Sequence, residues 1–383
     1  DKGAKATGSR KSAASSRNAT RKKSLGKASG NTNYYDNDNS INIDTGAYDN
    51  NPLLHLYEDE IELGNDSLDN VSDDDLVDML DLTRREIIKI AKNLNLPKFD
   101  VIVGNGSDEL IQLLCLLTAN EGKGKLLTPS PTFSVYKILA QIHGLSSFEF
   151  NLESGTFHLD TSRFIEEILK VDPSLIFIAN PNNPTGTWIE RSALEAFLDR
   201  VPENVIVVLD EAYTEYVETD DVPNGVDYLP RYPNLLVSRT FSKAYGLASL
   251  RVGYAISSPA IADVLNRVRQ PFNVNSLALA AACAALADSD YLAESRRLND
   301  AGMQQLEDGL RALGLGWIPS KGNFIAVDFG RDTAAINQAL LREGVIVRPV
   351  ANYGMPNHLR VTIGLPEENQ RFLDALKQVL SRG

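Results

Sequence analysis

The sequence predicts an α/β fold in which helices cover both faces of a mostly parallel β-sheet. Two observations lead to this prediction. Continuous apolar runs of strand length, such as LIFIA, VIVVL and LLV, occur between Ser174 and Ser238, and helix-like segments such as RSALEAFLDRV separate them. Strands that are apolar along their whole length are typical of parallel sheets buried on both faces, and alternation with helices is typical of the crossovers that such sheets need.

The first predicted strand and helix lie in the segment FDVIVGNGSDELIQLLCLL, which begins at Phe99. A short apolar strand is followed by a glycine turn. Four leucines then recur at helical spacing: Leu110, Leu113, Leu114 and Leu117. The hydroxyl of Ser107 is predicted to cap the amino end of this helix.

Three later strands are predicted to end in polar residues. SLIFIAN runs into the turn PNNPTG, NVIVVLD stops at Asp210, and NLLVSRT ends shortly before Lys243. In open parallel sheets, ligands bind beyond the carboxyl ends of the strands. We therefore expect residues 180–186, 210–213 and 238–243 to share one site.

The chain is predicted to divide into a basic tail and two folded domains. Residues 1–40 are expected to be a disordered tail, because their first part is basic, rich in small residues and nearly free of apolar ones. Residues 72–289 are expected to form a large domain and residues 290–383 a small one. Residues 41–71 are expected to be an N-terminal segment associated with the small domain.

Composition argues against several classes of protein. A net charge of −13 at pH 7 disfavours nucleic acid as a partner of the folded body. No apolar run reaches the length of a membrane span, so no membrane contact is expected. Cys115 and Cys283 lie in apolar helical contexts, which indicates core thiols in a reducing compartment and a cytoplasmic protein. The 4 histidines show no metal-ligand spacing, so no metal is expected.

Lys243 stands out among the polar residues at the predicted sheet edge. Its neighbours in TFSKAYG are hydroxyl, aromatic and small residues. Taken singly, each residue also has an ordinary structural interpretation. Lys243 could be a surface lysine, Asp210 could cap a helix, and Arg360 could lie on the solvent-facing side of a strand. Taken with an amide, a phenol and a phosphate-binding turn, they match the needs of pyridoxal 5'-phosphate. This cofactor requires a lysine that condenses with its aldehyde, an acidic partner for its ring nitrogen and a phosphate pocket.

Six segments of the chain carry a family resemblance: NPNNPTG, VVLDEAY, TFSKAYGLASLRVGY, RQPFNVN, GNFIAVDF and GVIVRPVANYGMPNHLRVTIG. Together they resemble the aminotransferase class of fold-type-I pyridoxal-phosphate enzymes, and in detail the histidinol-phosphate aminotransferases. The resemblance extends from about Leu96 to the carboxyl terminus. It implies a large domain with a mostly parallel sheet, a smaller α+β domain, and a homodimer with active sites at its interface.

The resemblance also implies roles for individual residues. Lys243 would be the Schiff-base lysine, Asp210 the partner of the pyridine nitrogen, and Tyr213 the third member of the catalytic group. Asn183 and Tyr213 would contact the ring hydroxyl O3', and Phe133 would stack on the ring.

Anion contacts follow from the same resemblance. The cofactor phosphate would be held by groups of the glycine turn and of the lysine loop: Gly106, Ser107, Asp108, Thr240, Ser242 and Arg251. Arg360 would bind the acidic end of the substrate, with Arg348 as a second anion contact and Asn183 beside them.

The amino-terminal quarter departs from the family's pattern. The family usually has an NENP segment that closes over the site, and then a YPD tyrosine that reaches the cofactor phosphate of the partner subunit. Here YDNNP, residues 48–52, stands for the first segment, whereas no YPD follows and HLYEDE with Tyr57 is a poor substitute. This departure leaves the phosphate contact between subunits open, and it does not touch the Schiff-base chemistry.

The implied reaction is reversible amino transfer between a small amino donor and a 2-oxo acid. Histidinol phosphate and 2-oxoglutarate, which give imidazole-acetol phosphate and glutamate in histidine biosynthesis, are the favoured pair. An aromatic amino-acid aminotransferase and a phospho-amino-acid decarboxylase remain open on the same scaffold, because Arg360 would accept a carboxylate or a phosphate with equal geometry. A pyridoxal-phosphate-sensing regulator is disfavoured, since residues 1–40 show no apolar periodicity of a helix-turn-helix domain.

Overall fold

The structure, a computed structural model, describes residues 100–218 and 222–382. These residues belong to one compact unit, Asn70–Gly383. The predicted tail 1–40, the predicted segment 41–71 and the YDNNP and Tyr57 motifs lie outside the described residues. The boundary between a large and a small domain at residues 289 and 290 stays a prediction.

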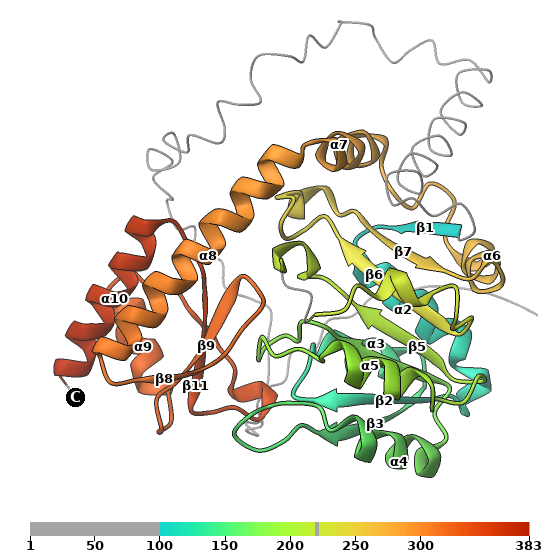
Figure 1. The fold of residues 1–383 in the computed structure, drawn as a ribbon, viewed down its shortest axis with the longest axis horizontal. Coiled ribbons are helices and arrows are strands. Elements are labelled where there is room, and N and C mark those ends of the chain that lie inside the picture. Colours follow the sequence, from blue (N-terminus) through green and yellow to red (C-terminus); the bar gives the residue numbers. More distant parts are fainter. Residues whose placement is uncertain (1–99, 219–221, 383) are drawn as a thin grey trace, which may run out of the picture. The chain divides into compact units, whose positions relative to one another are not determined.

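The first sheet is built from the strands β1 Asp100–Gly104, β2 Lys125–Ser130, β3 Ser146–Asn151, β4 Leu175–Ala179, β5 Ile206–Asp210, β6 Leu235–Thr240 and β7 Gly253–Ser257. Their order across the sheet is β1-β7-β6-β5-β4-β2-β3 (Figure 1). β7 runs antiparallel to both of its neighbours, and the other pairings are parallel. The predicted mostly parallel sheet is confirmed.

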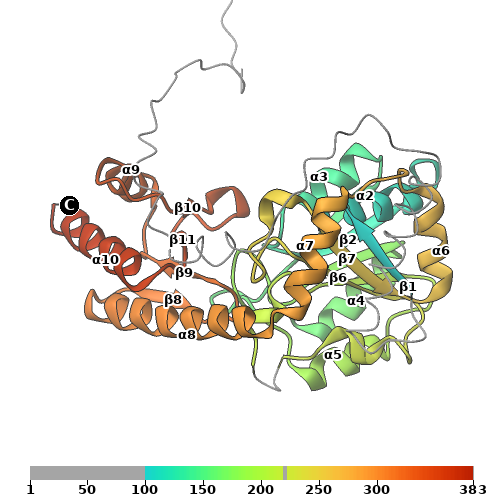
Figure 2. The same ribbon diagram turned by 90° about the horizontal axis from the view of Figure 1, so that it is seen from above.

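The helices around this sheet are α2 Ser107–Thr118, α3 Val135–Ile142, α4 Thr161–Val171, α5 Arg191–Leu198, α6 Pro259–Val268 and α7 Ser276–Ala287. Successive residues of a strand point to opposite faces of a sheet. On β5, Val207 and Leu209 join the apolar core of α4 and α5, whereas Val208 joins that of α2, α3 and α6. Figure 2 shows α2 and α3 on one side of the strands and α4 and α5 on the other. Both faces are therefore covered, as predicted.

The second sheet is antiparallel. Its strands are β8 Gly316–Ile318, β9 Phe324–Asp328, β10 Arg348–Pro349 and β11 His358–Thr362, in the order β10-β11-β9-β8. The helices α8 Ser289–Ala312, α9 Ala334–Arg342 and α10 Pro366–Ser381 accompany it. Leu306 of α8, Leu340 of α9 and Leu376 of α10 share an apolar core with Ile325 and Leu359 of the sheet. The other face of the second sheet, which carries Ile318 and Ala326, packs against Phe157 from the segment between β3 and α4.

Short 3-10 helices connect these elements: η3 Asn120–Gly122, η4 Thr214–Tyr216, η5 Gly225–Tyr228, η6 Ala248–Leu250 and η7 Ala351–Tyr353. Within the described residues, no helix taken singly has the length and apolar character to cross a membrane. α7 and α8 meet that test only as a pair, which is bent by 76°.

A buried ion pair ties together the two strand ends that the predicted site uses. Glu211 directly follows β5 and Arg239 lies in β6, and Glu211 Oε2 accepts hydrogen bonds from Arg239 Nε at 3.0 Å and Nη2 at 2.7 Å. Only 1% of the Glu211 side chain and 10% of the Arg239 side chain are exposed. Because Asp210 precedes Glu211 and Thr240 follows Arg239, the ion pair holds two residues of the predicted site at set positions.

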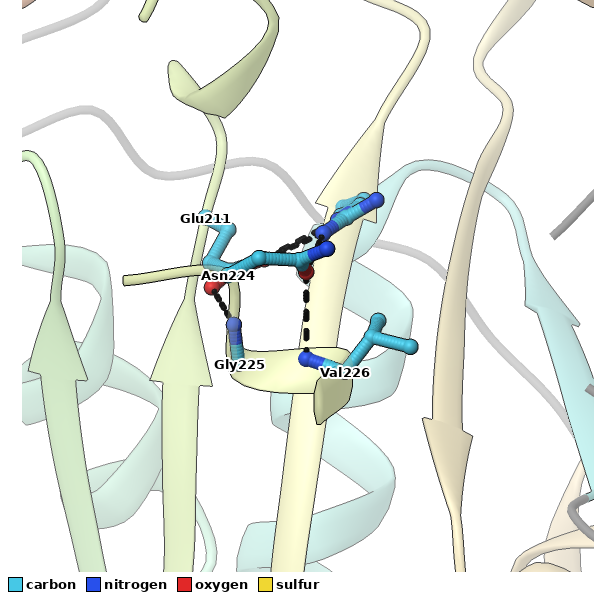
Figure 3. A network of polar contacts seen from close by, with 5 residues as sticks. Glu211, Asn224, Gly225 and Val226 are labelled. Carbon is cyan, nitrogen blue, oxygen red and sulfur yellow. Dashed lines mark hydrogen bonds and ion pairs between the residues drawn. The ribbon is translucent and has the colours of Figure 1, made fainter. Parts of the chain in front are cut away.

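Further donors and acceptors complete this network (Figure 3). Gly225 N donates to Glu211 Oε1 at 2.6 Å. Asn224 Oδ1 accepts from Arg239 Nη2 at 2.7 Å and from Val226 N at 3.2 Å. The start of η5 is thereby fixed against β5 and β6, and both oxygens of the buried carboxylate are satisfied.

Glu211→Gln is expected to lower the free energy of unfolding by about 3–5 kcal/mol, because the buried Arg239 would lose the carboxylate that binds it through two hydrogen bonds. Denaturant unfolding followed by circular dichroism measures this loss. Glu149→Gln is the matched control, since its 2.9 Å ion pair with Lys137 has side chains that are 42% and 44% exposed. The control should lose less than about 1 kcal/mol. Equal losses in the two variants would contradict the role of the buried pair.

Candidate active site

A pocket at the carboxyl ends of β4, β5 and β6 brings most of the predicted site residues together. The predicted residues in its wall are Ser107, Asp108, Phe133, Asn183, Asp210, Tyr213, Thr240, Ser242, Lys243 and Arg251. They come from the start of α2, the start of α3, and the segments that follow the three strands. The site is therefore built where the parallel strands end, as the sequence predicts.

Lys243 lies in the loop after β6, and its Nζ is 5.6 Å from the centre of the Tyr213 ring. The residue as a whole is exposed, yet the protein that surrounds its ammonium group lowers its pKa, and the Arg360 guanidinium lowers that pKa further. Asp210 acts in the opposite direction. A lowered pKa increases the fraction of neutral amine, which is the nucleophilic form of lysine.

Asp210 ends β5, and only 5% of its surface is exposed. Burial raises the pKa of its carboxyl to about 6, against the lowering effect of a hydrogen bond from Tyr136 Oη to Oδ2 at 2.5 Å. In the part of the chain that the structure describes, no side-chain donor reaches the other oxygen, Oδ1. The carboxyl group thus keeps one oxygen available for a cationic partner.

The start of α2 corrects one prediction. α2 begins at Ser107, the cap position is Gly106, and no side chain caps the helix. The predicted cap at Ser107 is therefore wrong. Gly106 has a φ of 77°, a left-handed conformation that glycine adopts at little cost, and a Cβ at this position would lie 2.3 Å from Arg251 Nη2. The uncapped N–H groups and the helix dipole together favour an anion here.

Arg251 adds a positive charge beside this helix end. Its Nη2 lies 3.1 Å from Asp108 Oδ2, and its Nη1 lies 3.4 Å from Ser242 Oγ. Thr240 Oγ1 accepts a hydrogen bond from Ser242 N at 3.1 Å, which orders the turn that carries both hydroxyl groups. A helix end, two hydroxyl groups and a guanidinium group converge, and this combination suits a phosphate.

The second sheet contributes Arg360 of β11 to the site. Its Nη1 donates a hydrogen bond to Asn183 Oδ1, and its Cζ lies 4.9 Å from the centre of the Phe324 ring. Tyr213 meets the same ring edge-on at 5.3 Å, and burial raises the pKa of Tyr213 to about 12, so its phenol stays protonated near neutral pH. An arginine, an amide and a phenol are thus held side by side.

Arg348 lies apart from the pocket wall. It is exposed on β10, where it pairs directly with Arg360 of β11. Directly paired residues of antiparallel strands place their side chains on the same face of a sheet. The two guanidinium groups therefore share a face, although the structure forms no contact between them.

Sequence reasoning missed Tyr136 of the pocket wall, and it missed Tyr353, which acts on the pKa of Tyr213. Tyr136 is fully buried and donates to Asp210, and Tyr353 of η7 places its hydroxyl 3.4 Å from Ser134 Oγ. A signal for Tyr136 exists, because it follows Phe133 by three residues and a buried phenol needs a polar partner. Tyr353 follows from no local pattern.

These groups fit the cofactor that the family resemblance implies. Asp210 Oδ1 is a buried oxygen without a side-chain partner, which suits the protonated nitrogen of a pyridine ring. The cradle at the start of α2 suits a phosphate, and a Cβ at Gly106 would fill part of it. Opposite pKa shifts at Lys243 and Asp210 within one cleft are also typical of a functional site.

Comparison with known proteins decides the family. The sequence pattern described as "Aminotransferase class I and II" matches residues 38–376. The chain belongs to this family. Relatives of this aminotransferase include histidinol-phosphate aminotransferase 2 of Pseudomonas fluorescens, 62% identical over 283 residues that cover 74% of this chain and 75% of the relative. Another is histidinol-phosphate aminotransferase 2 of Pseudomonas aeruginosa, 59% identical over 293 residues that cover 76% and 78%.

Solved structures of aminotransferases share the fold. One is the histidinol-phosphate aminotransferase of Sinorhizobium meliloti in complex with pyridoxal-5'-phosphate, with a TM-score of 0.73, 29% identity, and coverage of 79% of this chain and 82% of that one. Another, from Clostridium acetobutylicum, has a TM-score of 0.73, 26% identity and coverage of 79% and 90%. The predicted fold type and the predicted resemblance are confirmed, while the roles of single residues stay predictions.

Proposed function

We propose that this aminotransferase uses pyridoxal 5'-phosphate to transfer the amino group of histidinol phosphate to 2-oxoglutarate. The products are imidazole-acetol phosphate and glutamate, a step of histidine biosynthesis. The observation that carries the proposal is the convergence of Lys243, Asp210 and the phosphate cradle in one pocket. The names of relatives at 59% and 62% identity support the choice of substrate.

The cofactor supplies a cationic ring that stabilises negative charge at the Cα atom of the amino donor. Asp210 Oδ1 would pair with the ring nitrogen, and because the carboxyl is buried, this contact would be worth more than in water. Asn183 and Tyr213 would contact the ring hydroxyl, with the Tyr213 phenol as a hydrogen-bond donor. Phe133 would stack on the ring. The phosphate would be held by a set of helix and side-chain groups, with Asp108 contributing its backbone N–H group: Gly106, Ser107, Asp108, Thr240, Ser242 and Arg251.

Lys243 acts first as a nucleophile and then as a proton carrier. Its lowered pKa favours the neutral amine, which is the form that would hold the cofactor through its aldehyde. As a neutral amine, Lys243 would also be the group that takes a proton from the Cα atom of the amino donor and returns a proton to the product. Asp210 on one side and Arg360 on the other act on the pKa of Lys243 in opposite directions.

Two arginines give the substrate site its preference for anions. Arg360 binds the carboxylate of glutamate or 2-oxoglutarate, and Asn183 supports it through their shared hydrogen bond. Arg348 shares a sheet face with Arg360 and serves as the second contact that a doubly charged phosphate favours. The substrate side is therefore more positive than a monocarboxylate requires.

We also propose that the enzyme works as a homodimer in the cytoplasm. Phe272 is 69% exposed and Leu277, in the first turn of α7, is 72% exposed. Two large apolar side chains this close in sequence suit an interface with a second copy. Burial raises the pKa of the Cys115 thiol to about 12, so Cys115 stays a reduced thiol in the core. Neither nucleic acid nor a membrane is a proposed partner.

Lys243→Ala is expected to reduce turnover by at least about 10²–10⁴-fold, because the nucleophile and the proton carrier are lost together. Lys243→Arg should fail equally, since a guanidinium keeps its proton at accessible pH. Absorption spectroscopy of the purified protein with pyridoxal phosphate and an amino donor measures the change. Lys137→Ala, in the exposed pair with Glu149, is the control and should react normally. Near-native turnover of Lys243→Ala would reject the proposed function.

Arg348→Ala is expected to weaken histidinol phosphate by ~1.5–3 kcal/mol, or about 10- to 150-fold, and glutamate far less. The reason is that only the phosphate substrate needs a second guanidinium. Steady-state kinetics with both substrates measures the difference, and Arg342→Ala, an exposed arginine of α9, is the control. Equal small losses for both substrates, or a high kcat/KM for phenylalanine with none for histidinol phosphate, would favour an ordinary amino-acid aminotransferase.

Leu277→Asp is expected to shift the dimer toward monomers, because a charge would have to be buried at the proposed interface. Sedimentation velocity over a range of concentrations measures the dissociation constant. Leu169→Asp on α4, where the leucine is 65% exposed, is the control and should leave the assembly unchanged. A dimer that is insensitive to Leu277→Asp would place the interface elsewhere.

A further inference from the structure

Tyr136 lines the pocket from α3, and 0% of its surface is exposed. A phenol hydroxyl out of water needs a hydrogen-bond partner. Its hydroxyl donates to Asp210 Oδ2 at 2.5 Å, a length typical of an O–H donor to a charged oxygen. Burial and the nearby charge of Asp210 raise the pKa of Tyr136 well above its usual value, so the hydroxyl stays a donor at any working pH.

Two aromatic neighbours fix the direction of this hydroxyl. The Tyr136 ring stacks on Phe177 of β4, with centroids 4.6 Å apart and an interplanar angle of 3°. It also meets Phe133 edge-on, at 5.5 Å and 87°. A ring held on its face and at its edge cannot turn its hydroxyl away from Asp210 without breaking these contacts. Tyr136 therefore links the carboxyl group to Phe133.

The donated hydrogen bond acts on both the charge and the orientation of Asp210. Burial and Asp108 of α2 favour the neutral acid, whereas Tyr136 of α3, the N–H group of Ala212 and Lys243 of the loop after β6 favour the carboxylate. Among the groups that favour the carboxylate, Tyr136 has the largest effect. The same bond occupies Oδ2 and leaves Oδ1 without a side-chain partner.

We propose that Tyr136 is a positioning residue for amino transfer. Its hydroxyl keeps Asp210 in the carboxylate form with Oδ1 available to the ring nitrogen of the cofactor. Its ring supports Phe133, which stacks on the cofactor. The inference rests on the proposed function, and it gives α3 a part in the chemistry in addition to covering the sheet.

Tyr136→Phe tests the hydroxyl and keeps the ring. The affinity of the protein for pyridoxal phosphate should fall about tenfold or more, and the loss should be larger at mildly acidic than at alkaline pH. The direction of this pH dependence follows from the carboxyl group of Asp210. Without the Tyr136 donor, the pKa of Asp210 rises further, so the neutral acid persists to higher pH. The neutral acid cannot pair with a cationic ring, and the affinity is therefore lost mainly at mildly acidic pH. Titration of the visible absorption of the bound cofactor across this pH range measures both effects.

Two comparisons separate positioning from packing. Tyr232→Phe removes a hydroxyl that donates to Asp199 at the same 2.5 Å, outside the pocket, and should leave cofactor affinity unchanged. In an Asp210→Asn background, Tyr136→Phe should change the affinity less than about twofold, because the carboxylate on which it acts is gone. This double variant also removes the buried carboxylate that Tyr136→Phe alone would leave without its donor.

The proposal is overturned if the pH profile of Tyr136→Phe superimposes on that of the parent protein. It is also overturned if the loss of affinity is the same with Asn at position 210. These readouts need only the cofactor. If the parent protein binds pyridoxal phosphate at Lys243 but transfers no amino group, the proposed function is rejected. The cofactor affinities of the variants would still decide the role of Tyr136.

Discussion

The pairing of Glu211 with Arg239 is the constraint on which the site depends. Both charges lie out of water, so each requires the other, and together they hold the carboxyl ends of β5 and β6. Asp210 and the loop of Lys243 extend from these two ends. Burial of Asp210 and crowding of Lys243 each disfavour the charged form. Because the ion pair fixes the strand ends that carry Asp210 and the Lys243 loop, both groups can stay in environments that disfavour their charged forms.

The first sheet could be predicted because its central strands are apolar along their whole length. Segments such as IVVLD in β5 indicate burial on both faces without any knowledge of distant residues. The second sheet gives weaker signals, since β10 has 2 residues and β8 has 3, too short for a periodicity. The cap of α2 was misplaced because serine favours caps locally, whereas the left-handed φ of 77° at position 106 favours glycine there.

The residue types of the site could be predicted from the sequence, but the contacts that their side chains make could not. Asp210 and Lys243 follow apolar strands, so their place at the sheet edge comes from local pattern and from strand direction. The bond between Arg360 and Asn183 joins residues 177 positions apart, and the bond between Tyr136 and Asp210 spans 74 positions. Such contacts depend on how the sheets and helices pack, which no single segment encodes. The same is true of the pairing that sets Arg348 opposite Arg360.

The ion pair between Arg251 and Asp108 has a consequence for cofactor loading. The guanidinium that is proposed to receive the phosphate already has a carboxylate 3.1 Å away. Binding of a phosphate there would therefore exchange one anion for another and would not be a simple addition. The gain would be the difference between a dianionic phosphate and the Asp108 carboxylate, which is smaller than the attraction of an isolated arginine. A neighbouring carboxylate of this kind would favour doubly charged over singly charged solutes, and it offsets the positive charge of Arg251.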